Sequence, residues 1–241
     1  MKKHQIEADK EVIAVSKVLK QLEQRGLKEP CIASGWTRAW LTDTVKSDID
    51  IAYVGKIDYD IAKKFLKEII NKEQLMYLNW DINGIWNAEI ACPVIKTTKL
   101  HYLIYYVCSI DSVYLASDGQ LYDPTGYGFQ DAENKILRMH DFQKIDFNYL
   151  PVDIVYFCLE GCRRIAKFGW APTERSNELI LFGTKLWKKL SKTDKEYFYQ
   201  KKIIKKFNKE EWASLSDKYN EYHWGFIFDE TEKYMKNKSF S

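Results

Sequence analysis

The segment "IASGWTRAWLTDTVKSDIDIAYVG", residues 32–55, decides how the fold is interpreted. Its last part reads as a buried strand, yet it holds Asp48 and Asp50 one residue apart among isoleucines. Residues two apart in a strand project to the same face, so both carboxylates should lie together while Ile49 and Ile51 anchor the strand in the core. Two like charges in an apolar setting are costly unless a cation or another partner neutralises them.

The acid pair therefore predicts a site for one or two Mg²⁺ ions, which proteins bind through a few carboxylates together with the phosphates of a nucleotide. Upstream, Ser34 and Gly35 form a turn between a strand and a helix start, where backbone N–H groups can hold phosphate oxygens. Arg38 would add a charged hydrogen bond to a triphosphate. An alternative stays open, in which the acids face water on an edge strand, the turn is an ordinary one and Arg38 is a solvated helix residue.

Bulk composition is that of a folded, soluble chain. The 241 residues are enough for one large domain or two small ones, and 46% hydrophobic with 15% aromatic residues exclude a disordered chain. A net charge of +3 is too small to indicate a partner by itself. No apolar stretch resembles a signal peptide or a membrane span, so we expect a cytoplasmic protein with no membrane partner.

The five cysteines fall mostly in apolar segments, which is typical of buried thiols in a reducing compartment. Cys158 and Cys162 lie one helical turn apart, but a zinc site needs two further ligands, and the sequence places no second metal-ligating residue at a suitable spacing from His140. We therefore expect a structural role for these thiols.

Periodicity predicts an α/β part over residues 1–145 and a helical part over residues 146–241. Apolar spacing predicts helices over 7–26 and 59–71, and short strands over 31–34 and 48–54. β-Branched and aromatic residues predict hairpin-linked strands over 75–108, although the run at 99–110 would also suit a buried helix. Residues 117–138 are rich in Gly, Asp and Pro and predict a turn-heavy connection.

From about Leu150 onward helices are expected. Pro151 suits a helix first turn, and an apolar stripe runs to Gly169. A further helix follows over 171–190, and Thr193 with Glu196 three residues later has the pattern of a capping box.

Two segments together resemble a known family. "SGWTRA" followed by "SDIDI" resembles the Gly-Gly-x-x-Arg-Asp…Asp-x-Asp signature of the DNA polymerase β-like nucleotidyltransferases, and in particular the head of bacterial-type CCA-adding enzymes and poly(A) polymerases. "DGQLYDPTGYGFQDAENKILR" is similar to a second family segment. Its matching positions are Asp118, Gly119, Asp123, Pro124, Gly126, Asp131, Leu137 and Arg138. A looser likeness continues in "VDIVYFCLEGCRRIAKFGW", so that the resemblance covers about residues 7–170.

The resemblance implies a mixed sheet flanked by helices, followed by a helical neck and body. It implies transfer of a nucleoside monophosphate from ATP or CTP to the 3′ hydroxyl of a tRNA-like RNA, with Mg²⁺ held by Asp48 and Asp50. A third acid usually comes from a neighbouring strand, for which Glu89 is the first candidate and Asp81 the second. The implied nucleotide-binding set is Ser34, Gly35, Arg38, Ser47 and Asp153.

The chain departs from the family pattern at several positions. Ala39 stands where the family has an acid, and "YYVCSIDS", with Asp111 as its one acid, stands where the family has Arg-Arg-Asp. The arginine that the family pairs with the acid at Asp153 is either replaced by Tyr156 or shifted along the chain. Two alternatives therefore stay open: transfer to a small-molecule or protein hydroxyl, and a non-catalytic module that binds nucleotide or RNA.

Lysines alternate with aromatic residues between 185 and 209, a combination that suits phosphate contacts and base stacking. An amphipathic helix with a solvated basic face and an aromatic core face explains the same pattern. The predicted RNA-binding lysines are Lys188, Lys189, Lys201, Lys202 and Lys205.

Overall fold

The computed structural model describes residues 3–44, 47–87, 107–143, 150–200, 230 and 233. The chain divides into two compact units, Met1–Asn134 and Lys135–Ser241. These two units are groups of residues that contact one another, whereas the predicted domains were assigned a catalytic and a binding function. The predicted catalytic head at 1–145 and helical body at 146–241 thus stay a prediction.

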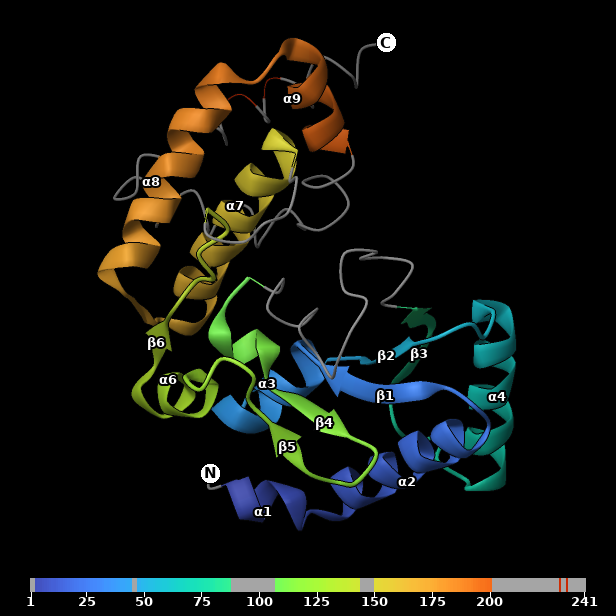
Figure 1. Ribbon diagram of the computed structural model, residues 1–241. Helices are drawn as coiled ribbons and strands as arrows, with labels where there is room; N and C mark the ends of the chain where they lie inside the picture. The colour runs from blue at the N-terminus through green and yellow to red at the C-terminus, as the bar shows by residue number, and fades with distance from the viewer. Residues whose placement is uncertain are drawn as a thin grey trace. The chain divides into compact units, whose positions relative to one another are not determined.

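The first unit is built on a mixed five-stranded sheet flanked by helices, which confirms the predicted fold class (Figure 1). The strand order is β3-β2-β1-β4-β5, in which β2 and β3 are parallel and the other neighbours are antiparallel. The strands are β1 (Lys28–Ala33), β2 (Ile49–Val54), β3 (Trp80–Asn87), β4 (Tyr114–Ala116) and β5 (Leu121–Tyr122).

Two helices of this unit begin at an aspartate cap. Asp9 accepts a hydrogen bond of 2.8 Å from the backbone N–H of Glu11, and Asp58 accepts one of 2.8 Å from that of Asp60. The helical segments are α1 (Lys3–Glu7), α2 (Lys10–Gln24), α3 (Gly35–Thr42), α4 (Tyr59–Lys72), the 3₁₀ helix η2 (Ser109–Ser112) and α6 (Gly128–Asn134).

The two faces of the sheet carry different side chains. Ile32, Ile51 and Tyr53 are fully buried, and α2 contacts β1 while α4 contacts β3. The opposite face of β1, β2 and β4 carries the smaller cluster Cys31, Ala33, Ala52 and Tyr114. Asp50 lies two residues before Ala52 and therefore belongs to that second face.

Two predictions about the middle of the chain are only partly covered: the hairpin links within 75–108 are not tested, since β3 is the one strand described there, and the turns predicted over 117–138 are present at 117–120 and 123–127. β3 is joined to β2 through α4 and pairs with it in parallel, because a crossover helix returns the chain to the same end of the sheet. The connection over 117–138 is not turns alone, since it also contains β5, α6 and β6. Residues 88–106, with the rest of the predicted hairpins and most of the run at 99–110, lie outside the described residues.

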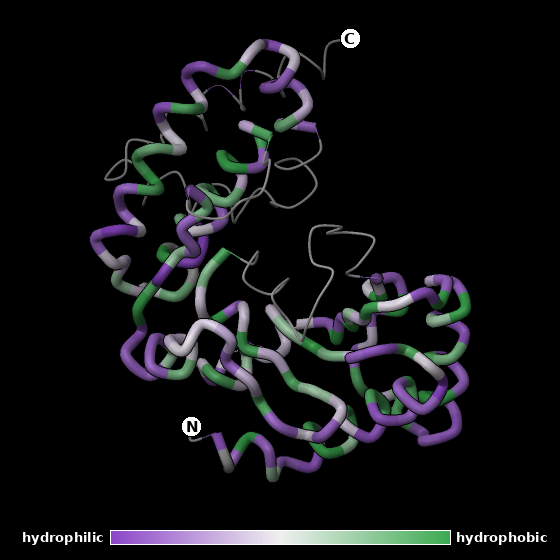
Figure 2. The backbone as a smooth tube through the Cα atoms, in the orientation of Figure 1, coloured by the Kyte–Doolittle hydropathy of each residue, from purple (hydrophilic) through white to green (hydrophobic). Residues whose placement is uncertain are grey.

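In the second unit the described residues between 150 and 200 are mostly helical, as predicted. The unit contains α7 (Pro151–Phe168), α8 (Glu174–Lys189) and α9 (Lys192–Phe198), together with a short parallel pair of β6 (Ile136–Leu137) and β7 (Ala171–Pro172). Figure 2 shows hydrophilic and hydrophobic residues alternating along α8, as expected for a helix with one buried face. Among the described residues no helix is both long enough and apolar enough to cross a membrane.

The predicted capping box is wrong. Ser191 is the N-cap of α9 and accepts a hydrogen bond of 3.1 Å from the backbone N–H of Asp194, so Thr193 lies inside the helix. Ser191 and Thr193 both carry a hydroxyl that could cap a helix. The helix begins directly after Ser191, so Ser191 is the cap.

Candidate functional site

The acid pair lies at the start of β2. Asp48 and Asp50 are exposed, whereas Ile49 and Ile51 are 1% and 0% exposed. The alternation expected from the sequence is therefore present in the strand. The amide of Asn79, directly before β3, donates a hydrogen bond to Asp48 Oδ1 and fixes that carboxylate.

A bulge in β3 brings a third carboxylate to the pair. Ile49 is opposite Trp80 and Ile51 is opposite Ile85, so five steps along β3 match two along β2. Asp81 begins the extra stretch and accepts a hydrogen bond of 2.8 Å from the backbone N–H of Asn83. A Cβ atom at position 84 would overlap Asp50 Oδ1 and lie 3.2 Å from Asp81 Cβ. Only glycine leaves room for both acids there.

The electrostatics of Asp50 report on this crowding. Partial burial, then the charge of Asp81 and then that of Asp48, raise the pKa of Asp50 from 3.8 to about 6. Three carboxylates thus lie close together where β2 and β3 begin. A divalent cation there would remove the repulsion among them.

The Ser34–Gly35 turn lies between β1 and α3. Ser34 has φ 63° and ψ −121°, a left-handed conformation that is uncommon outside glycine and occurs preferentially at functional sites. Its N–H donates a hydrogen bond of 3.0 Å to the backbone carbonyl of Asp111. A Cβ atom at Gly35 would overlap the hydroxyl of Ser47, so Ser47 packs directly against the turn. The structure therefore brings Ser34, Gly35 and Ser47 together next to the first acid.

Arg38 makes a buried ion pair with Asp111. The two side chains are 12% and 1% exposed, and the Cys108 thiol donates to the other oxygen of Asp111 at 3.1 Å. Since Asp111 also holds the Ser34 N–H, the pair fixes the turn from behind. Asp111 was noted in the sequence only as an acid at a divergent motif, and its separation of 73 positions from Arg38 hides the contact.

The second sequence motif supports this arrangement from α6. Asp131, which is 1% exposed, accepts a hydrogen bond of 2.5 Å from the hydroxyl of Ser109 in η2. Asp123 accepts from the hydroxyl of Thr125 at 2.7 Å and from backbone N–H groups that lead into α6. These acids are engaged in holding η2 and α6, and η2 carries Asp111.

The donor set suits magnesium in its chemistry. Within the described ranges no group of three or more His, Cys, Asp or Glu side chains is placed closely enough to enclose a metal ion. Magnesium does not need such a cage, because it keeps several waters and uses one or two carboxylates together with substrate phosphates. Asp48 and Asp50, with the raised pKa of Asp50 as a sign of unneutralised charge, fit that requirement.

The remaining predicted site residues lie elsewhere or outside the description. Asp153 is in the first turn of α7 in the second unit. Lys188 and Lys189 are exposed in the last turn of α8. Glu89, Lys201, Lys202 and Lys205 lie outside the described residues.

The aromatic residues near these lysines are mostly core residues. Trp187 and Phe198 are fully buried, and their rings make an edge contact with centroids 5.0 Å apart. In the described part of the basic tract, Tyr197 is the exposed aromatic. The amphipathic interpretation therefore fits α8 and α9 better than a stacking platform does.

The buried thiols show no sign of metal binding. Cys158 donates to the backbone carbonyl of Leu179 at 3.2 Å, and burial raises the pKa of the Cys158 and Cys162 thiols. Both are therefore protonated and inert near neutral pH.

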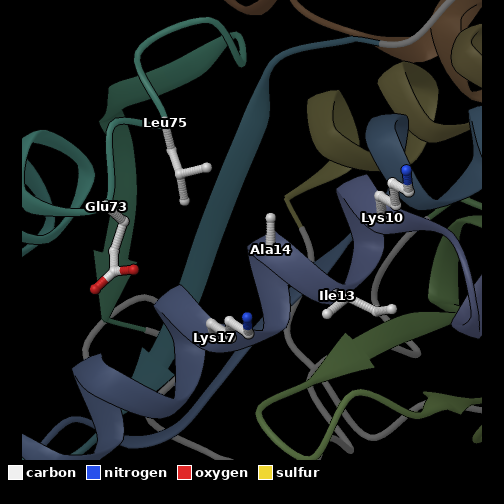
Figure 3. Close-up of a pocket in the computed structure, with 6 residues that line it drawn as sticks. All are labelled: Lys10, Ile13, Ala14, Lys17, Glu73 and Leu75. Carbon is white, nitrogen blue, oxygen red and sulfur yellow. The ribbon is translucent and has the colours of Figure 1, made fainter.

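A separate pocket of about 330 Å³ contains none of the predicted site residues (Figure 3). Lys10, Ile13 and Lys17 of α2 form one side of it, and Glu73 and Leu75 form the other. Glu73 accepts a hydrogen bond of 3.0 Å from Gln21. This pocket is therefore not part of the acid site.

Comparison with solved structures shows that this chain has the fold of a nucleotidyltransferase head. A tRNA-processing enzyme in an apo form matches with a TM-score of 0.63 and 14% identity, over 89% of this chain and 57% of that one. A CCA-adding enzyme in complex with ATP matches at 0.59 and 16%, over 90% and 51%. A tRNA nucleotidyltransferase complexed with a primer tRNA and an incoming ATP analogue matches at 0.59 and 16%, over 85% and 60%.

These likenesses concern the fold, since the identities are low and the chain spans only 51–60% of the three matched chains. The resemblance inferred from the two sequence segments agrees with the structural matches. No family model matches the chain, and no curated protein matches it.

Proposed function

We propose that this chain is a Mg²⁺-dependent nucleotidyltransferase. It transfers a nucleoside monophosphate from ATP or CTP to the 3′ hydroxyl of a tRNA-like RNA and releases pyrophosphate. The observation that carries the proposal is the meeting of Asp48, Asp50 and Asp81 beside the Ser34–Gly35 turn, on a nucleotidyltransferase fold.

In this proposal Asp48 and Asp50 hold the metal, and Asp81 completes the acid set. Glu89, the other candidate third acid, lies outside the described residues and stays a prediction. Bound Mg²⁺ supplies charge neutralisation at the triphosphate and acidifies the attacking hydroxyl. The hydroxyl oxygen forms a bond to the α-phosphorus, the α–β bridging P–O bond breaks, and a carboxylate of the cluster takes the hydroxyl proton.

The turn positions the triphosphate. Backbone N–H groups at Gly35 and the start of α3 are available to phosphate oxygens, and the missing Cβ of Gly35 makes room for the hydroxyl of Ser47 beside them. Arg38 is engaged with Asp111, so we assign it the task of fixing this turn. Asp153, Lys188 and Lys189 are kept as candidate nucleotide and RNA contacts of the second unit.

A second candidate is transfer to a small-molecule or protein hydroxyl. Burial of Trp187 and Phe198 supports it, since it removes stacking surface that RNA would use. The Tyr156 hydroxyl supports it too, because this group interacts with Glu160 at the position where an arginine was expected.

The test is incubation with ATP or CTP labelled at the α-phosphate, Mg²⁺, and either tRNA lacking its 3′ end or total small molecules and proteins. Label on the tRNA 3′ end, lost with EDTA and in Asp48→Ala, is expected. Label on another acceptor would select the second candidate. If no acceptor is labelled and Asp48→Ala retains the protein's cellular effect, the enzyme proposal is wrong and a non-catalytic module remains.

A further inference from the structure

A second, smaller pocket lies where β1, β4 and β5 meet the end of α2. It has a volume of about 100 Å³ and is lined by three carboxylates and two tyrosines, together with smaller groups. These five side chains are Glu23, Glu29, Asp118, Tyr114 and Tyr122. None of them belongs to the acid site described above.

The hydroxyl of Tyr114 faces this pocket without a partner. Tyr114 is 5% exposed, and within the described ranges its hydroxyl makes no hydrogen bond. Burial is the main cause that raises the pKa of Tyr114. The electrostatic effect of four neighbours that also line the pocket adds to it, in the order Cys31, Tyr122, Asp118 and Glu29. The phenol is therefore neutral and keeps its lone pairs as acceptors. The Tyr114 side chain is thus almost entirely buried, and its hydroxyl is available to a ligand in the pocket.

Within the described residues, none of the three carboxylates makes an ion pair. Glu23 accepts from the hydroxyl of Ser117 at 2.7 Å, and Asp118 accepts from the N–H of Gln120 at 3.0 Å. Glu29 has neither a hydrogen bond nor an ion pair within the described part of the chain. Glu29 has φ 51° and lies in a bulge of β1, and a bulge changes the direction in which a side chain points.

The faces of the Tyr114 and Tyr122 rings already contact other groups, so a ligand in the pocket would meet mainly oxygen atoms. Tyr114 and Tyr122 stack with centroids 5.2 Å apart and planes at 14°. Lys3 Nζ lies 6.0 Å from the centroid of Tyr122. The Tyr122 hydroxyl donates to Asp118, so its oxygen can still accept a hydrogen bond. A fitting ligand therefore carries positive charge and several N–H donors.

We propose that this pocket binds a primary ammonium group, which has three donors for Tyr114 and the carboxylates. The volume equals that of about three water molecules at roughly 30 Å³ each, enough for an ammonium with two or three methylenes. A free alkylamine and a lysine side chain share this chemistry. The proposal does not depend on the proposed function.

Calorimetric titration at pH 7.5 with n-butylammonium chloride tests the site, with n-butanol as the neutral probe of the same shape. Butylammonium is expected to bind and butanol not. Glu29→Gln and Tyr114→Phe should each weaken binding by about tenfold or more, since each removes a charged or charge-assisted hydrogen bond. Glu29 is partly exposed, so its variant keeps the test valid even if the Tyr114 change disturbs packing.

Glu133→Gln is the matched control, because it removes one exposed carboxylate of the same unit away from the pocket lining. It should leave the affinity within about twofold of the wild type. Titration with the peptide acetyl-Gly-Lys-Gly-amide separates the sources: binding of both probes admits a lysine side chain, and binding of butylammonium alone selects a free amine. Equal binding of butanol, no binding at all, or an effect of Glu133→Gln equal to that of Glu29→Gln would overturn the proposal.

Discussion

Asp50→Asn should stabilise the metal-free protein while abolishing the proposed nucleotidyl transfer. Partial burial and the charges of Asp81 and Asp48 raise the pKa of Asp50 from 3.8 to about 6, so its ionised form is disfavoured in the folded state. A shift of about 2 units corresponds to a ceiling of about 3 kcal/mol at 1.36 kcal/mol per unit. Because the side chain reaches solvent, screening reduces this and we expect about 1 kcal/mol.

The sign of the pH dependence follows from the direction of the shift. The folded state keeps its proton to higher pH than the unfolded state, so ionisation of Asp50 lowers the stability as pH rises from about 4 through 6. The gain from Asp50→Asn should therefore be complete at pH 8 and absent near pH 4.

Urea unfolding in EDTA, followed by tryptophan fluorescence at both pH values, measures this difference. Asp43→Asn is the control, since Asp43 is exposed and has φ 53°, a conformation that asparagine also tolerates. Added Mg²⁺ should stabilise the wild type and not Asp50→Asn. A variant that is less stable than the wild type at pH 8, or equally shifted at both pH values, would refute the crowding of charges.

Three further outcomes are expected. Gly84→Ala should displace the adjacent carboxylate and lower kcat about 100-fold with an unchanged circular dichroism spectrum; retained turnover would contradict the close approach. Arg38→Met should lose about 3 kcal/mol in urea unfolding, because it leaves Asp111 buried and unpaired, and adding Asp111→Asn should restore part of the loss. Ser191→Ala should cost about 1 kcal/mol and Thr193→Ala under about 0.5, and the reverse order would place the cap of α9 at the later residue.

Local signals in the sequence predicted the elements that carry the acid pair. The alternation of Asp48, Ile49, Asp50 and Ile51 is a two-residue pattern, and α2 and α4 follow a short helical repeat with an aspartate cap. Such patterns depend on neighbours within a few positions, so one sequence is enough to read them.

Contacts between residues far apart in the chain could not be predicted from these local patterns. The pairing of β3 with β2 depends on a crossover, and the contact of Arg38 with Asp111 joins residues 73 positions apart. One signal was available and went unused: Gly84 interrupts a strand-like run, which indicates a bulge or a close approach of another group. It would have favoured Asp81 as the third acid on the described strands.

The bulge in β3 has a consequence for how such proteins diverge. Asp81 belongs to a stretch that the ladder with β2 bypasses, since pairing resumes at Ile85. Deleting those residues would keep every strand partner and remove one carboxylate. An inactive descendant with an intact sheet is therefore a single short deletion away, so architecture and chemistry can be inherited independently.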